Sequence, residues 1–141
     1  MMKSIFSLIL VSCTFFAFSQ SPIGVWKSID DETGEEKSNV TIYEQNGKVF
    51  GKISKILSAA PDVVCEKCTG DKKNKPIMGL VIIENLKAAD GYWKKGNILD
   101  PESGNTYGCS IWFEDGKPDE LKVRGKHWTG FYRTQTWHRV K

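Results

Sequence analysis

The sequence predicts an all-β protein in which about eight antiparallel strands follow one another in an up-and-down meander and close into a barrel. Three observations favour this fold. Apolar and polar residues alternate in one short segment after another, turn-forming residues separate these segments, and no long segment repeats its apolar residues with the period of a surface helix. Closing the sheet leaves no unpaired edge strand, which favours a barrel over an open sheet.

The first 19 residues have the layout of a secretory signal peptide. Lys3 precedes an apolar run, and the run ends in the small residues Ala17 and Ser19, which form an A-x-S cleavage site. The run is too short for a stable membrane-spanning helix, so no transmembrane segment is expected. These features predict that residues 1–19 are removed and that residues 20–141 form one domain of a periplasmic or secreted protein.

A lipid anchor is the alternative for the same segment. Residues 10–13 look like the lipobox of bacterial lipoproteins, in which Cys13 would be acylated. Residues 14–18 continue the apolar run after this cysteine, whereas a lipoprotein usually becomes polar there. Simple export is therefore favoured over lipidation. The end of the segment, residues 18–20, resembles signal-peptide ends of exported bacterial proteins.

The strands are expected over eight short segments. These are residues 23–29, 38–44, 48–54, 77–84, 91–99, 105–114, 119–126 and 130–140. Asn46 and Gly47 stand between the second and third segments, and because both tolerate positive φ they predict a tight hairpin. The other segments are separated by sequences rich in Asp, Gly, Pro and Asn, which favour turns. Only residues 54–60 could form a short helical turn.

Residues 77–83 are apolar on both faces of the expected strand. Since a barrel strand has only one face inside, something must cover the other face. We favour the loop of residues 58–76 as this cover, and a second subunit is the alternative. The protein is therefore expected to be a monomer or a homodimer.

The charge pattern does not favour a nucleic-acid partner. The 20 Lys and Arg residues and the 17 Asp and Glu residues are spread along the chain, and the formal net charge is +3. No arginine-rich or aromatic-basic block is present, so we interpret the lysines as a solvated surface and expect no nucleic-acid binding.

No catalytic constellation is recognisable in the sequence. The chain has 2 histidines, both near its C-terminus, and no Gly-x-Ser-x-Gly motif to present a nucleophilic serine. Asp100 and Glu102 flank Pro101 in a turn-forming sequence, which is the commoner role for such residues. We therefore expect a protein that is not an enzyme and uses no cofactor.

The two ends of the domain resemble the structural signature of lipocalin-like barrels. Gly24-Val25-Trp26 lies on the first expected strand, and Arg139 ends the last one. In such barrels the arginine lies across the indole and closes the base by stacking and by bonding to backbone carbonyls. The resemblance implies that Gly24, Trp26 and Arg139 close one end of this barrel.

Nearly all of residues 23–140 also resembles a family of small exported bacterial proteins known as domain of unknown function 2147. This resemblance implies a lipocalin-like fold and no established activity. The matching blocks are Gly24-Val25-Trp26, Val40-Thr41-Ile42-Tyr43, Gly47 with Gly51-Lys52-Ile53, Cys65-Glu66-Lys67-Cys68, Pro76-Ile77-Met78-Gly79, Gly96 to Pro101, Leu121 to Gly125 and Gly130 to Arg139.

Cys65 and Cys68 are three positions apart and allow three interpretations. In an oxidising compartment they would form a local disulfide that staples a loop, which we favour. A zinc site would need more ligands, for which Cys109, His127 and His138 are the candidates. A redox pair would need its first thiol at a helix N-terminus, and turn-forming residues follow instead. We expect a disulfide, no metal, and a buried, unpaired Cys109.

All three arginines, Arg124, Arg133 and Arg139, fall in the last eighteen residues. By alternation Arg133 and Arg139 share one face of the last strand with Trp137, whereas Arg124 lies on the outer face of its strand. Arg133 is the best candidate for a ligand contact, as an anion-binding group at the barrel mouth. For the arginines as a group we favour the structural interpretation, with Arg139 closing the barrel and Arg124 in a surface or cross-strand pair.

The five tryptophans are mostly expected in the core, since aromatic side chains dominate burial in small domains. Trp93, Trp112 and Trp128 remain candidates to line a cavity for an apolar ligand.

These observations favour an exported, non-catalytic protein that binds a small apolar or amphipathic ligand inside a lipocalin-like barrel. One alternative is an interaction module of the cell envelope, with residues 58–83 as its contact surface and the disulfide as its staple. Another is zinc or redox chemistry at Cys65 and Cys68.

Overall fold

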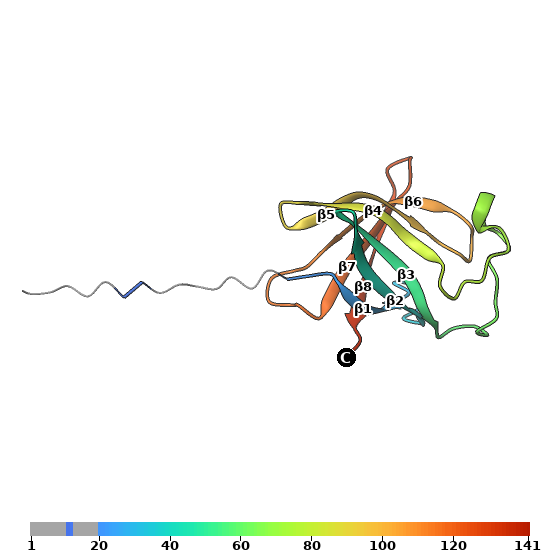
Figure 1. Cartoon of the computed structure of the whole chain (residues 1–141), viewed down its shortest axis with the longest axis horizontal. Coiled ribbons are helices and arrows are strands. Elements are labelled where there is room, and N and C mark those ends of the chain that lie inside the picture. The colour runs from blue at the N-terminus through green and yellow to red at the C-terminus, as the bar shows by residue number, and fades with distance from the viewer. Residues whose placement is uncertain (1–10, 13–19) are drawn as a thin grey trace, which may run out of the picture.

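The computed structural model describes residues 11–12 and 20–141. The predicted signal peptide, apart from residues 11 and 12, and the lipidation alternative at Cys13 lie outside the described residues. From Gly24 onward the chain forms one closed antiparallel barrel, in which each strand pairs with the next and the first pairs with the last (Figure 1). The all-β meander barrel predicted from the sequence is confirmed.

The barrel has eight strands, and a short 3-10 helix, η1, lies in the loop between the third and fourth. Their bounds are β1 Gly24–Ile29, β2 Glu36–Gln45, β3 Lys48–Ile56, η1 Gly70–Lys72, β4 Val81–Ala89, β5 Tyr92–Leu99, β6 Thr106–Trp112, β7 Glu120–Lys126 and β8 Tyr132–Arg139. Burial follows the alternation of the sequence, as in β2, where Ser38, Val40 and Ile42 are buried and the residues between them are not.

Asn46 and Gly47 form the tight turn between β2 and β3. Their φ angles are 53° and 75°, in the left-handed region that asparagine and glycine tolerate best. The strands on either side pair in register from Gln45 and Lys48 back to Thr41 and Lys52. The hairpin predicted from the Asn-Gly pair is confirmed.

Two local predictions are wrong. Residues 54–60 do not form a helical turn, because β3 continues to Ile56 and still pairs there with β2. The fourth strand starts at Val81 and not at residue 77, because Gly79 has a φ of 83° and turns the chain. Within the part of the chain that the structure describes, no helix is long and apolar enough to cross a membrane.

The interior of the barrel holds an apolar core built from all eight strands. Burying each of these large side chains stabilises the fold by roughly 1.5–3 kcal/mol. The largest fully buried ones are Trp26, Trp137, Ile42, Ile83, Leu86, Ile111 and Leu121. Cys109 belongs to this core as a buried, unpaired thiol.

One end of the barrel is closed around Trp26. The guanidinium of Arg139 lies 4.2 Å from the centre of its ring, and the indole Nε1 donates to the carbonyl oxygen of Pro22 at 2.8 Å. Trp26 and Arg139 also pair across β1 and β8, so the same residues join the two edges of the sheet. A Cβ atom at Gly24 would lie 3.1 Å from Arg139 Nη1, which leaves little room for a side chain there.

Arg139 further ties three parts of the closed end together. Its Nη2 donates to the carbonyl oxygens of Ser21 and Pro118 at 3.2 and 3.1 Å, and its Nε lies 3.2 Å from a carboxylate oxygen of Asp119. The planar guanidinium can make these bonds while it stacks on the indole, because its donors lie in the plane and its face stays free.

The chain between β3 and β4 forms a long loop, residues 57–80, which we call the strap. It lies at the other end of the barrel, beside the turn between β5 and β6 (Figure 1). Lys72 anchors it to β4 through Val81 O at 3.1 Å and Glu84 Oε1 at 3.3 Å. The Sγ of Cys65 lies 3.5 Å from Pro101 O in the β5–β6 turn. The strap is therefore fixed at two places.

Candidate functional site

The barrel contains a cavity of about 860 Å³ that opens at the end away from Trp26 and Arg139. Ser28, near the end of β1, and Asp30, just after it, line the cavity, whereas Trp26 belongs to the closed end of the same strand. This volume lies in the range of pockets that hold small organic ligands, and eight-stranded barrels are wide enough to enclose one such molecule.

The inner walls of the cavity are apolar. Trp137 is 2% exposed and reaches the cavity from β8. Its indole Nε1 donates to Gln135 Oε1 at 2.8 Å, so the polar atom of the indole is satisfied within its own strand. The remaining apolar lining of the interior comes from four of the other strands and comprises Ile53, Ile56, Ile82, Ile98, Leu99 and Val123.

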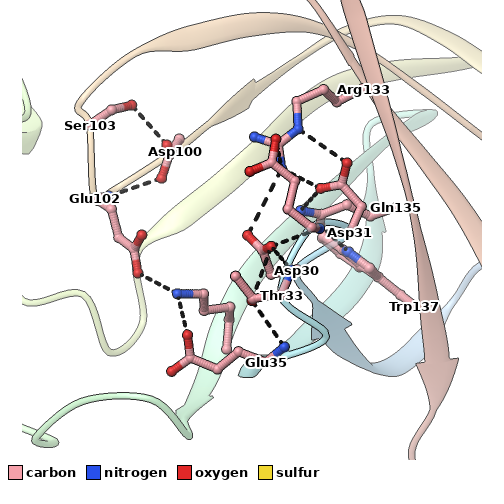
Figure 2. A network of polar contacts seen from close by, with 12 residues as sticks. Asp30, Asp31, Thr33, Glu35, Asp100, Glu102, Ser103, Arg133, Gln135 and Trp137 are labelled. Carbon is pink, nitrogen blue, oxygen red and sulfur yellow. Dashed lines mark hydrogen bonds and ion pairs between the residues drawn. The ribbon is translucent and has the colours of Figure 1, made fainter.

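The mouth of the cavity is polar and carries an ion-pair network (Figure 2). Arg133 of β8 donates from Nε and Nη2 to the two oxygens of Asp31 at 3.1 and 2.5 Å. Gln135 Nε2 lies 3.5 Å from the same carboxylate, at the limit of a hydrogen bond. The hydrogen bond from Arg133 holds the pKa of Asp31 below its ordinary value, so this carboxyl stays ionised.

The turn between β1 and β2 presents these carboxylates because Asp30 organises it. Asp30 Oδ1 accepts the backbone N–H groups of Glu32 and Thr33 at 2.9 and 2.8 Å, and the Thr33 hydroxyl at 3.1 Å. The backbone hydrogen bonds lower the pKa of Asp30. This is the Asx-turn chemistry expected of an acidic hairpin loop, and it places Asp31 opposite β8.

Lys37 is a second paired cation at the mouth. Its Nζ lies 2.9 Å from Glu35 and 3.0 Å from Glu102, and these two bonds raise the pKa of the ammonium. Glu102 belongs to the β5–β6 turn, where Asp100 accepts the backbone N–H of Glu102 at 3.0 Å and the hydroxyl of Ser103 at 2.8 Å. The ammonium therefore links two turns across the rim.

The strap forms one side of the mouth. Val63, Val64, Glu66 and Lys67 line the cavity from it. Close to these residues a disulfide joins Cys65 and Cys68, and both cysteines are buried. The favoured interpretation of the cysteine pair, a stapled loop, matches this geometry.

A zinc site at Cys65 and Cys68 would need further ligands beside them, and the described residues supply none. Among the residues that the structure describes, no three His, Cys, Asp or Glu side chains are grouped so that they could hold a metal ion. Cys109 is in the barrel core, and His127 Nδ1 is 2.7 Å from the hydroxyl of Thr129 in the β7–β8 hairpin. His138 lies in β8. None of the three candidates forms such a group with Cys65 and Cys68 in the described part of the chain.

Burial raises the pKa of the Cys109 thiol from 9.0 to about 12. Between these values the unfolded chain has lost the thiol proton and the folded chain has kept it, so unfolding releases a proton. The free energy of unfolding is therefore expected to fall as pH rises from 9.0 to about 12, by up to about 1.4 kcal/mol per pH unit.

Urea unfolding at several alkaline pH values checks this expectation, with Cys109→Ala as the control. All other ionisable groups are common to the two proteins and cancel in the comparison. The wild-type chain should show the steeper loss of stability with pH. Parallel pH profiles of the two proteins would contradict the assigned burial of the thiol.

The structure separates the four residues that the sequence suggested as ligand contacts. Arg133 lines the mouth. Trp93 lines a separate recess of about 470 Å³ at the closed end. Trp112 lies on the outer face of β6, where the Arg124 guanidinium is 4.8 Å from its ring. Trp128 is 89% exposed at the tip of the β7–β8 hairpin. Trp112 and Trp128 are absent from the cavity lining, which Trp137 supplies instead.

Several residues of the site had not been singled out in the sequence. The sequence pattern indicates Asp31 and Glu35 only as members of a turn, and Lys37 only as a surface lysine. One signal indicated that Arg133 has a partner, because an arginine on the inward face of a strand needs a hydrogen-bond acceptor. The partner itself could not be identified, since Asp31 and Arg133 are 102 positions apart.

A family model described as an uncharacterized protein conserved in bacteria, DUF2147, matches residues 24–139. Among solved structures, protein HP1028 from Helicobacter pylori, a member of the lipocalin family, superposes with a TM-score of 0.72 at 18% identity. The match covers 84% of this chain and 82% of that one, and at this identity it shows the fold alone. No curated protein shows a significant match. The chain is therefore a member of the bacterial DUF2147 family and has a lipocalin-like barrel.

Proposed function

We propose that this protein is an exported binder of a small apolar or amphipathic ligand, which it holds in the barrel cavity. The observation that carries the proposal is the open cavity of about 860 Å³ with apolar walls and a polar rim. Such a cavity would bury the apolar part of a ligand and leave its polar end at the mouth. Export is supported by the signal-peptide pattern and by the Cys65–Cys68 disulfide, which is typical of oxidising compartments.

Binding without catalysis is the simpler proposal for this site. The ionised groups at the mouth already have structural tasks. Asp30 and Asp100 cap their turns, and Asp31 is paired with Arg133. A general acid or base would need a pKa near the working pH, whereas the pKa values of Asp30 and Asp31 are shifted away from neutrality.

The envelope-interaction alternative receives less support. It requires an apolar surface on residues 58–83, and of the large hydrophobic side chains that the structure describes as exposed, only Met78 at 39% lies in that range. The most exposed of those in the barrel domain are Trp128 and Phe131, on the β7–β8 hairpin.

Filling the cavity tests the proposed function. Gly125 lines the cavity, and a Cβ atom there would lie 3.5 Å from Ile98 and Tyr107, an ordinary contact distance. Gly125→Phe is therefore expected to weaken binding of phenylnaphthylamine, an uncharged fluorophore, by at least about tenfold, because the added ring occupies the ligand volume. Fluorescence titration measures the binding.

Gly108→Phe is the matched control. Gly108 lies one position from Cys109 in β6 and is exposed, and an added Cβ atom has only Lys126 O nearby, at 3.6 Å. The same ring on the outer face should leave binding unchanged. If the fluorophore does not bind the wild-type protein, or binds all three proteins equally, the cavity is not the binding site.

A further inference from the structure

The cations at the mouth of the cavity are already paired. Arg133 meets Asp31 in a two-bond pair, and oxygens of Asp30 and Glu32 lie 4.0 and 3.5 Å from its Nη2. A ligand carboxylate that approached this guanidinium would first meet three protein carboxylates. It would have to displace Asp31 or accept their repulsion.

Lys37 offers no free charge either, because Glu35 and Glu102 flank its ammonium at 2.9 and 3.0 Å. Lys67 is the third cation of the lining, and it has no carboxylate at ion-pair distance among the residues that the structure describes. It is exposed on the strap, where water screens its attraction for an anion.

Carboxylates outnumber cations around the mouth. The lining contains four carboxylates against three cations, namely Asp30, Glu66, Asp100 and Glu102 against Lys37, Lys67 and Arg133. Beyond the lining, Lys37 and Arg133 are paired with three more carboxylates, Asp31, Glu32 and Glu35, and one more cation, Lys73, bonds to the carbonyl oxygen of Glu66. Three other titratable residues line the cavity, Tyr107, Tyr132 and His127, and His127 is hydrogen-bonded through Nδ1 to Thr129. The summed field at the mouth is therefore negative.

We propose that the cavity selects amphiphiles by the charge of their polar end, binding a primary amine or another cation in preference to a carboxylate on the same alkyl chain. A cation can add to the carboxylates of the rim without breaking a pair, whereas an anion must break one or bind the exposed Lys67, where water screens the attraction. This inference rests on the proposed function and names the ligand class for the same cavity.

Displacement of phenylnaphthylamine by dodecylamine, dodecanol and dodecanoate tests the inference, because the three share one chain length and differ in charge. At neutral pH and low salt, dodecylamine is expected to displace the fluorophore at roughly tenfold lower concentration than dodecanoate, with dodecanol between them. Equal displacement by the amine and the carboxylate, or a preference for the carboxylate, would overturn the inference and leave the proposed function standing. If neither the fluorophore nor any of the three compounds binds, both fail.

Two variants test the role of the paired cation. Asp31→Asn leaves Arg133 without its two-bond partner and removes one negative charge, so dodecanoate should bind several-fold more tightly and the preference for the amine should shrink. Asp115→Asn removes the same charge from the exposed β6–β7 turn, away from the cavity lining, and should leave the preference unchanged.

Glu102→Gln is a second rim variant in case Asp31→Asn does not fold. It leaves Lys37 with Glu35 alone and should shift the preference in the same direction. If the folded rim variants keep the wild-type order of affinities, or if Asp115→Asn changes it equally, the pairing at the mouth does not set the selectivity.

Discussion

Replacing Trp26 by alanine is expected to lower the free energy of unfolding by about 3–5 kcal/mol, the usual range for deleting a large buried aromatic side chain. Trp26 is 0% exposed, with the Arg139 guanidinium on its ring and the ring of Phe113 at 5.8 Å. The substitution leaves a hole at the closed end of the barrel and removes the donor to Pro22 O. Urea unfolding of the two proteins measures the loss.

Trp112→Ala is the control for this prediction. Trp112 is only partly buried and lies on the outer face of β6 against Tyr92 and Arg124, so its removal opens no hole in the core. Equal destabilisation by the two tryptophan substitutions would contradict the closing role of Trp26. Arg139→Lys adds a separate test, because lysine keeps the charge but lacks the planar fork that reaches Ser21 O and Pro118 O.

Substituting Gly104 is expected to displace the strap from the β5–β6 turn. Gly104 has a φ of 77°, and a Cβ atom there would lie only 1.9 Å from the carbonyl oxygen of Lys67. Backbone atoms cannot yield as the end of a flexible side chain does, so the strap itself must move. Gly104→Ala should therefore lower the free energy of unfolding by about 1–3 kcal/mol more than the φ strain alone.

Gly116→Ala measures the φ strain by itself, because Gly116 has a φ of 73° and no atom within 4 Å of an added Cβ. Hydrogen exchange provides the second measurement. The amides of Cys65 and Asn74, which donate to strap carbonyls, should exchange faster in Gly104→Ala than in Gly116→Ala. If the two substitutions have the same effect on stability and on these amides, the strap is not held by its contact with Gly104.

Loosening of the strap in Gly104→Ala is expected to displace part of the cavity mouth as well. Val63, Val64, Glu66 and Lys67 form part of the mouth, and they are carried by the segment that would move. The disulfide between Cys65 and Cys68 restricts that segment, and neither cysteine is among the residues that line the cavity. Its role in the proposed function is to keep one wall of the mouth in place, as a structural staple.

Much of the fold could be predicted because alternation is a local property. A strand that faces a core on one side must alternate, so the eight segments could be found without knowledge of their neighbours. The Asn46-Gly47 turn is local for the same reason, since its φ angles depend on two residues. Predictions were wrong where a single glycine outweighed the pattern, as at Gly79, which turns the chain just before the apolar strand β4.

The site could be predicted only in part. Alternation shows that Arg133 and Trp137 share a strand face, and both do line the cavity. It also sets Trp112, three positions from the buried Cys109, on the outer face of β6, so Trp112 as a cavity candidate conflicted with that pattern, and it stacks with Arg124 outside. Irregular positions add to this difficulty, since Asn85 and Lys95 have positive φ inside β4 and β5 and interrupt their alternation.

The sequence by itself determined the strands and the turn at Asn46, because each depends on neighbouring residues. Its resemblance to lipocalin-like barrels identified Gly24, Trp26 and Arg139 as the residues that close one end. Only the tertiary structure decided which charged groups at the mouth of the cavity are paired with one another. Arg133 was the best candidate for an anion-binding group, and closure of the barrel brings it against Asp31, 102 positions away, where its positive charge is already paired. The physical reason is that a charged side chain can bind a ligand only if no group of the protein already pairs with it. Residues far apart in the sequence come together to form such pairs only when the sheet closes.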